Sequence, residues 1–145
     1  MTDAILTAAG IRLGRTASSR EEAVRLSGSI LVELGAVEPE YVAAMWEREQ
    51  ILSSYVGEST AIPHGTNESR KYVNFAQLSF VRFASSVDWE GDDVRLVIGI
   101  ASANDDHVET LGTLAEVLMD PDGRDVLMNT PDADDIVELI GMAFE

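Results

Sequence analysis

Residues 94–101 form an almost unbroken apolar run in which most side chains are branched. Such a run is typical of a central strand covered on both faces, because a half-exposed strand alternates apolar and polar residues. Residues 75–83 do alternate, which predicts a second strand, and residues 11–13 suit a short one. A chain with such a central strand needs apolar helices for both sides of its sheet.

Helical patterns occur both before and after these strands. Ser19 and Glu22 have the spacing of a capping box, apolar residues follow at helical intervals, and Gly35 is a plausible stop. A second helix is expected to begin around Pro39, a residue that suits the first helical position. Further helices are expected near residues 108–118, 121–128 and 132–142. The predicted fold is a single domain over residues 1–145, an α/β sandwich with a mixed sheet covered by helices on both faces.

The composition indicates an ordinary globular protein. With 145 residues, 46% of them hydrophobic and 25% charged, the chain has the size of one domain and needs no disulfide to fold. It contains no cysteine, which excludes thiol nucleophiles and thiolate metal sites and is compatible with the reducing cytosol. The first residues are acidic where an export signal is basic, and no apolar stretch approaches the roughly 20 residues of a membrane span. A cytoplasmic location without membrane insertion is therefore expected.

The charge of the chain is strongly negative and unevenly spread. Of 26 acidic and 10 basic side chains, residues 1–72 hold ten acids and seven bases, which leaves sixteen acids and three bases for residues 73–145. This balance makes nucleic acids and anionic membranes poor partners. A protein partner with a basic patch is the better expectation, while most of the acids are expected only to keep the surface soluble.

Both histidines occupy distinctive positions. His64 lies between Pro63 and Gly65, which shape the turn around its ring and make it the best candidate nucleophile. His107 follows the apolar run and begins a predicted helix, a position where ligands of α/β sheets commonly bind. Ordinary explanations stay open: His64 as a hydrogen-bonded turn residue, and the neighbouring Asp105 and Asp106 as helix-capping acids.

Other chemistries find little support in the sequence. The chain has no glycine-rich phosphate loop, no dinucleotide fingerprint and no nucleophile elbow. Asp105, Asp106 and His107 could suggest a metal, but three consecutive side chains at a helix start do not point to one centre. No cofactor and no metal are expected.

Residues 48–66 resemble a known protein family. The matching segments are Arg48-Glu49, Tyr55-Val56-Gly57-Glu58-Ser59 and Ala61-Ile62-Pro63-His64-Gly65-Thr66. With residues 35–42 before them and 95–107 after them, they resemble the enzyme IIA domain of the mannitol/fructose class, part of the bacterial phosphoenolpyruvate-dependent sugar phosphotransferase system. The resemblance covers roughly residues 10–142. Its Asn-Asp-Asp-His segment at 104–107 is closest to the mannitol branch, whereas residues 85–93 match no branch.

The resemblance implies a chain of phosphoryl transfer. His64 would accept the phosphoryl group from phosphohistidine on the carrier protein HPr and pass it to a cysteine of an enzyme IIB domain, for a membrane sugar permease on another chain. Arg48 is implied to hold the phosphoryl group and His107 to be a second histidine near the site. Glu58 lies in the matching motif, either to orient a neighbouring group or only to shape its loop.

Two other functions stay open at this point. A fructose-type or nitrogen-related regulatory member of the class would use the same phosphorylation as a switch, and the nitrogen-related type would not feed a sugar permease. An acidic interaction module would carry no phosphoryl group, and its histidines would be structural. Transfer of label to a mannitol-class IIB partner tests the first, and acid-labile, base-stable label on His64 tests the second.

Overall fold

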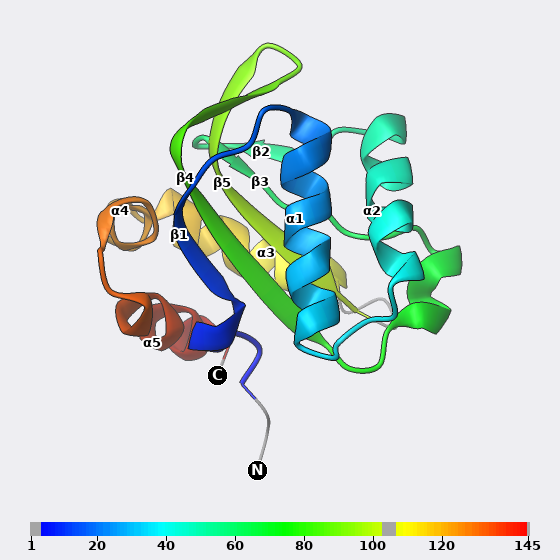
Figure 1. Cartoon of the computed structure of the whole chain (residues 1–145). Helices are drawn as coiled ribbons and strands as arrows, with labels where there is room; N and C mark the ends of the chain where they lie inside the picture. The colour runs from blue at the N-terminus through cyan, green and yellow to red at the C-terminus, as the bar shows by residue number, and fades with distance from the viewer. Residues whose placement is uncertain (1–3, 103–106, 145) are drawn as a thin grey trace.

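The computed structural model describes residues 4–102 and 107–144, which form a five-stranded sheet between two layers of helices (Figure 1). The strands are β1 (Ile11–Arg15), β2 (Tyr55–Gly57), β3 (Thr60–Ala61), β4 (Gln77–Trp89) and β5 (Asp92–Ala101). Their order in the sheet is β1-β4-β5-β3-β2. β1 pairs parallel to β4 and β3 parallel to β5, whereas the β4–β5 and β2–β3 pairs are antiparallel. The predicted mixed sheet is confirmed, with the apolar run of β5 at its centre.

Helices cover both faces of the sheet, as predicted. Two lie on one face, α1 (Arg20–Glu33) and α2 (Glu40–Ile51), and three on the other, α3 (His107–Met119), α4 (Pro121–Asn129) and α5 (Ala133–Ala143) (Figure 1). Two short 3₁₀ helices, η1 (Ala8–Gly10) and η2 (Glu68–Tyr72), were not predicted. Among the residues described, no helix combines the length and the apolar character needed to cross a membrane.

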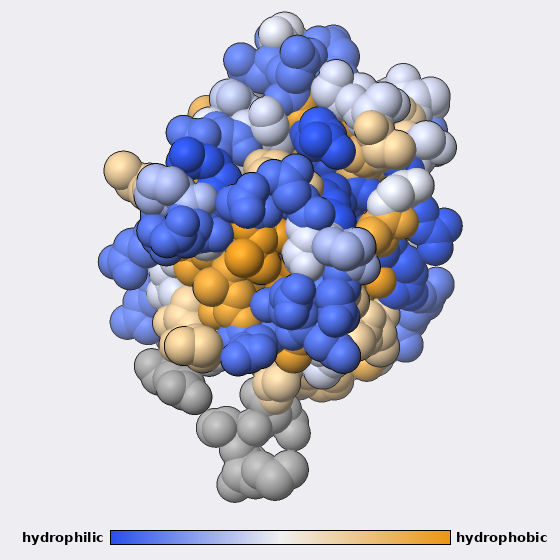
Figure 2. Space-filling model, turned by 90° about the vertical axis from the view of Figure 1, so that its left-hand side faces the viewer, coloured by the Kyte–Doolittle hydropathy of each residue, from blue (hydrophilic) through white to orange (hydrophobic). Residues whose placement is uncertain are grey.

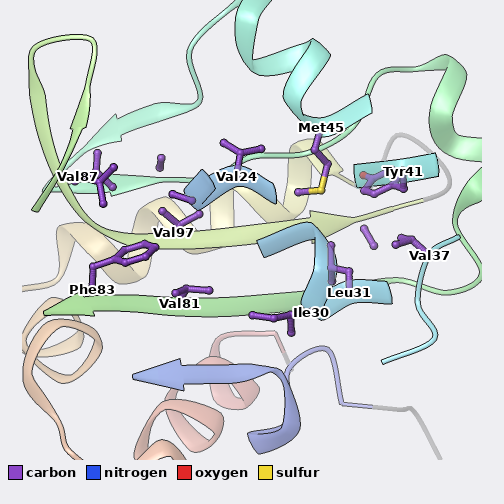
Figure 3. Close-up of a cluster of buried hydrophobic side chains, with 14 of the residues drawn as sticks. Val24, Ile30, Leu31, Val37, Tyr41, Met45, Val81, Phe83, Val87 and Val97 are labelled. Carbon is purple, nitrogen blue, oxygen red and sulfur yellow. The ribbon is translucent and has the colours of Figure 1, made fainter. Parts of the chain in front are cut away.

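The side chains of β4 and β5 point alternately to the two faces of the sheet, so the hydrophobic core has two halves. Leu78 and Phe80 of β4 pack with side chains of α3, α4 and α5, while Val81 and Phe83 pack with α1 and α2. Figure 3 shows the half on the α1 and α2 side, in which Val97 of β5 also lies. Because successive strand residues point to opposite faces, only a strand that is apolar at nearly every position can supply both halves.

The first helix begins and ends where local signals place its ends. The Ser19 hydroxyl accepts a hydrogen bond from the Glu22 amide at 3.1 Å, and the chain leaves the helix through Gly35 at φ +78°. The Glu22 carboxylate completes the cap by accepting from Ser18, whose hydroxyl and amide lower the pKa of that carboxyl group. The second helix begins at Glu40, one residue after the expected start.

The strand predicted over residues 75–83 was too short. β4 begins at Gln77 and continues to Trp89, and with β5 it forms a hairpin that projects at the top of Figure 1. The alternating pattern fails over residues 84–86, which are exposed, and the pairing register shifts between Arg82 and Val87. Pairing with β5 therefore extends the strand beyond the segment that hydropathy alone indicates.

The outer face of the α4 and α5 layer is mainly hydrophilic. Figure 2 views the molecule from this side and shows polar residues around a smaller apolar area. The first turns of α4 and α5 carry Asp122, Asp134 and Asp135. Negative charge at a helix N-terminus is favourable, so these acids both solubilise the surface and stabilise the helices.

Candidate functional site

A cleft of about 400 Å³ opens beside the carboxyl end of β5. Its walls come from both ends of α2, from the segment after β3, from η2 and from the end of β5. The lining residues are Tyr41, Arg48, Ile51, His64, Gly65, Thr66, Asn67, Arg70, Ile100 and Ser102. Parallel strands end at the same edge of a sheet, so the residues after β3 and β5 meet here, as ligand sites of α/β proteins commonly do.

The backbone after β3 places His64 in this cleft. His64 forms an isolated parallel bridge with Ile100, and the Ile100 amide donates to the Pro63 carbonyl at 2.9 Å. The half-buried ring turns its Nδ1 to the Ile62 carbonyl oxygen at 3.1 Å. A carbonyl oxygen only accepts hydrogen bonds, so Nδ1 carries the proton and the lone pair of the neutral ring is on Nε2. His64 is thus oriented as a nucleophile through one defined nitrogen.

Tyr41 holds the turn after His64 against the sheet. Its hydroxyl donates to the Ile100 carbonyl at 2.8 Å and accepts from the Gly65 amide at 2.9 Å. A Cβ atom at Gly65 would lie 2.5 Å from the Tyr41 ring and 2.3 Å from the Ser69 hydroxyl oxygen, so only glycine allows this approach. Glycine is therefore needed at position 65 because a larger side chain would not fit beside Tyr41 and Ser69. Tyr41 is a residue of the site that sequence reasoning missed.

The hydroxyl of Tyr41 is kept protonated by its surroundings. Burial raises the pKa of Tyr41, while the Gly65 amide and the charge of Arg70 act in the opposite direction. A protonated hydroxyl can donate to the Ile100 carbonyl and accept from Gly65 at once. The bridge between α2, β5 and the His64 turn thus depends on the neutral form of this side chain.

Arg48 lines the cleft from the last turn of α2. Its Nη1 donates to the Leu52 carbonyl at 2.8 Å, which caps the C-terminal end of the helix. A cation is favourable at this end of a helix, and a guanidinium group has further N–H donors for an anion. The structure thus brings together Arg48 and His64, which lie sixteen residues apart in the sequence.

Arg70 adds a second guanidinium group to the cleft. It lies in η2, and its Nη2 donates to the Asn67 side-chain oxygen at 3.1 Å. The match to the family motif ends at Thr66, so nothing in the motif selects Arg70. The sequence signal that could have pointed to Arg70 is its position four residues after the motif, in a chain with only 10 basic residues.

Glu58 is not brought into this cleft. It lies exposed in the turn between β2 and β3 at φ 51°, and its carboxylate is 3.5 Å from Nη1 of Arg124 in α4. Both residues line a different cleft of about 390 Å³. The Glu58 carbonyl accepts from the Thr60 hydroxyl at 2.9 Å. Of the two roles left open by the sequence, this geometry favours shaping the loop over orienting a group beside His64.

The acidic segment before α3 lies outside the described residues. This applies to Asn104, Asp105 and Asp106 and to the side chain of His107, whose backbone begins α3. Within the described ranges, no three acidic or histidine side chains gather in a way that would hold a metal ion. The cleft has the chemistry of an anion site: two arginines, hydroxyl groups and a histidine with a defined nucleophilic nitrogen.

Comparisons with known proteins agree with this geometry. The family model for EIIA 2 of the phosphoenolpyruvate-dependent sugar phosphotransferase system matches residues 4–142. The mannitol-specific phosphotransferase enzyme IIA component of Halalkalibacterium halodurans is 38% identical, with 97% of this chain and 97% of that protein covered. The mannitol-specific EIICBA component of Vibrio cholerae is 42% identical over 90% of this chain, which spans only 20% of that protein.

A solved structure also matches the whole architecture. A chain of the complex between the mannitol enzyme IIA and phosphorylated enzyme IIB of Escherichia coli aligns with a TM-score of 0.85 at 40% identity. The alignment covers 92% of this chain and 95% of that chain. The sequence match and the shared fold together show that this chain belongs to the EIIA 2 family of the phosphoenolpyruvate-dependent sugar phosphotransferase system.

Proposed function

We propose that this chain is a phosphoryl carrier that accepts a phosphoryl group from phospho-HPr on His64 and passes it to an enzyme IIB domain. The observation that carries the proposal is the hydrogen bond from Nδ1 of His64 to the Ile62 carbonyl, in a cleft that Arg48 and Arg70 also line. That bond leaves Nε2 as the attacking atom. The named relatives and the solved complex with enzyme IIB support the same chemistry.

The transfer needs two displacements at phosphorus. In the first, the Nε2 lone pair of His64 forms a P–N bond while the P–N bond to the histidine of HPr breaks and its electron pair returns to that nitrogen. In the second, a cysteine thiolate of enzyme IIB forms a P–S bond, and the electron pair of the P–N bond returns to Nε2 of His64. The proton stays on Nδ1 throughout, hydrogen-bonded to the Ile62 carbonyl oxygen, so His64 is ready for the next cycle.

Two arginines offset the negative charge of the protein at this point. An arginine about 4 Å from a phosphoryl charge contributes about 4 kcal/mol at an effective dielectric of about 20. Surface acids beyond about 8 Å are largely screened at physiological salt. Local geometry therefore outweighs the net charge of −16. Arg48 and Arg70 would stabilise the equatorial oxygens of the group in transit, which is the main task of a protein in phosphoryl transfer.

The relatives support a proposal for the sugar. Both named relatives are mannitol-specific, so we propose that the phosphoryl group serves the uptake and phosphorylation of mannitol. We also propose that the chain acts in the cytoplasm. The Vibrio cholerae relative joins its IIA region to other parts in one protein, so the IIB domain is the proposed receiver here too. His107 is proposed to donate a hydrogen bond to the phosphoryl group from the start of α3 without carrying it.

One experiment tests the proposal directly. The protein is incubated with labelled phosphoenolpyruvate, enzyme I and HPr, and then with a mannitol-class enzyme IIB. The parent is expected to take an acid-labile, base-stable label and to pass it on, whereas a folded His64→Ala variant takes none. Label in that variant would refute the assignment of His64. A labelled protein that never passes its label to enzyme IIB would instead indicate the regulatory function.

A further inference from the structure

Glu49 is a buried carboxyl group that the proposed transfer does not use. It lies in the last turn of α2, directly after Arg48, and only 1% of its surface is exposed. The group accepts three hydrogen bonds: from the Ser54 amide at 2.7 Å, from the Ser54 hydroxyl, and from Nε1 of Trp89 at 3.1 Å.

The position of this carboxyl group is costly for local stability. Removing an acidic group from water is unfavourable unless hydrogen bonds replace the lost solvation. Negative charge near a helix C-terminus is also unfavourable, because the carbonyl groups there carry partial negative charge. All three partners of Glu49 are neutral donors, so the group is satisfied without a counterion. Helix stability therefore gives no reason for glutamate at this position.

A continuous series of hydrogen bonds joins Glu49 to the ring of His64. Glu49 fixes the amide and the hydroxyl of Ser54, and the Ser54 carbonyl accepts from the Ile62 amide at 3.0 Å. The Ile62 carbonyl accepts from Nδ1 of His64 at 3.1 Å. Only two residues, Ser54 and Ile62, thus lie between the buried carboxyl group and His64 in this series. Glu49 also lies in the same last turn of α2 as Arg48, which lines the cleft.

Trp89 connects the same carboxyl group to the projecting hairpin. Its side chain is fully buried near the end of β4, forty residues from Glu49 in the sequence. The next residue, Glu90, pairs with Arg20 of α1 at 2.7 Å, and the Arg20 guanidinium lies over the Trp46 ring of α2 at 5.0 Å. The hairpin is therefore held against the α1 and α2 layer at two adjacent points.

We infer that Glu49 is a positioning residue for phosphoryl transfer, which fixes the segment from Ser54 through Ile62 and thereby the orientation of the His64 ring. The inference rests on the proposed function and adds a residue to it. Because His64 takes part in both displacements, loss of Glu49 is expected to slow acceptance and donation alike. A docking residue would instead impair the encounter with one partner.

The decisive variant is Glu49→Leu, which keeps nearly the size of the side chain and accepts no hydrogen bond. A glutamine would be a weaker test, because its oxygen can accept from the Ser54 amide and from Nε1 of Trp89 while its NH₂ group donates to the Ser54 hydroxyl oxygen. Leucine removes all three bonds. A misplacement of about 1 Å can cost roughly 10²-fold in rate. We expect kcat to fall by at least about tenfold in both half-reactions, with little change in KM for phospho-HPr.

Two controls separate positioning from stability. Glu47→Leu makes the same change on an exposed residue of the same helix and should leave both rates at the parent value. Val87→Ala removes a buried side chain from the hairpin without touching Glu49, so it should lower the melting temperature without lowering kcat. Nitrogen-15 spectra of the unphosphorylated ring report its tautomer: the parent is expected to show Nδ1–H, and Glu49→Leu a mixture of both tautomers.

The outcomes decide between the alternatives. Parent-like rates and an unchanged His64 tautomer in Glu49→Leu would overturn the inference, as would an equal loss of kcat in Val87→Ala at matched stability. If Glu49→Leu does not fold, Ser54→Ala decides, because it removes only the hydroxyl donor: slower transfer supports the inference and parent-like transfer overturns it. A parent protein that takes no label at all would refute the proposed function itself, and the tautomer measurement would still test the positioning.

Discussion

The contact between Gly65 and Tyr41 can be tested by adding a single methyl group. In Gly65→Ala the new Cβ would lie 2.3 Å from the Ser69 hydroxyl oxygen and 2.5 Å from the Tyr41 ring. Neither distance is possible for a real Cβ, so the backbone at residue 65 or the ring must move. Either movement breaks the bridge in which the Tyr41 hydroxyl joins the Gly65 amide to the Ile100 carbonyl.

The expected loss of stability has two parts. Overpacking of a filled site costs about 1–3 kcal/mol. Each of the two hydrogen bonds of Tyr41 contributes about 0.5–1.5 kcal/mol. The free energy of unfolding should therefore fall by roughly 2–6 kcal/mol, a large share of the roughly 5–15 kcal/mol of a typical domain. At about 2–4 °C per kcal/mol, the melting temperature should drop by at least about 4 °C.

The assay combines urea unfolding with transfer of label from phospho-HPr. Since the moved turn carries His64, transfer should slow at temperatures where Gly65→Ala is still folded. Gly112→Ala is the matched control, because Gly112 lies within α3 and no heavy atom beyond its neighbours and its own helix lies within 4 Å. That control should be stabilised by about 0.5–1 kcal/mol. A Gly65→Ala protein as stable and as active as the parent would show that the Tyr41 bridge does not hold the turn.

Two further predictions concern Arg48 and Tyr41. Arg48→Lys should slow transfer by roughly 10- to 100-fold while changing stability little, because lysine lacks the planar fork that binds two phosphoryl oxygens; equal rates in a folded variant would assign Arg48 only to its bond with Leu52. Because burial raises the pKa of Tyr41, its contribution to stability should be complete below about pH 10 and be lost as the pH rises through the raised pKa. Urea unfolding of Tyr41→Phe should show a lower stability at neutral pH and a weaker fall above about pH 10, and an identical pH dependence in both proteins would contradict the assignment.

The sequence predicted much of the fold because its signals are local. Ser19 and Gly35 set the limits of α1 through hydrogen bonds and dihedral angles that involve neighbours within a few residues. The apolar run of β5 specifies a strand covered on both faces whatever its neighbours are. The prediction was wrong where pairing between strands sets the length of a strand. β4 extends to Trp89 because β5 pairs with it there, although the alternation of apolar and polar residues in β4 fails over residues 84–86.

The residues of the candidate site also fall into those that the sequence identified and those that only the tertiary structure brought together. The segment around His64 and its match to the family fixed the candidate nucleophile, because proline and glycine constrain the backbone directly beside it. Tertiary structure alone selected Arg70, which η2 folds into the cleft, and left Glu58 in a different cleft beside α4. It also joined Glu49 to Trp89 across forty residues. These contacts depend on how distant segments pack, and no local preference of either segment encodes the distance between them.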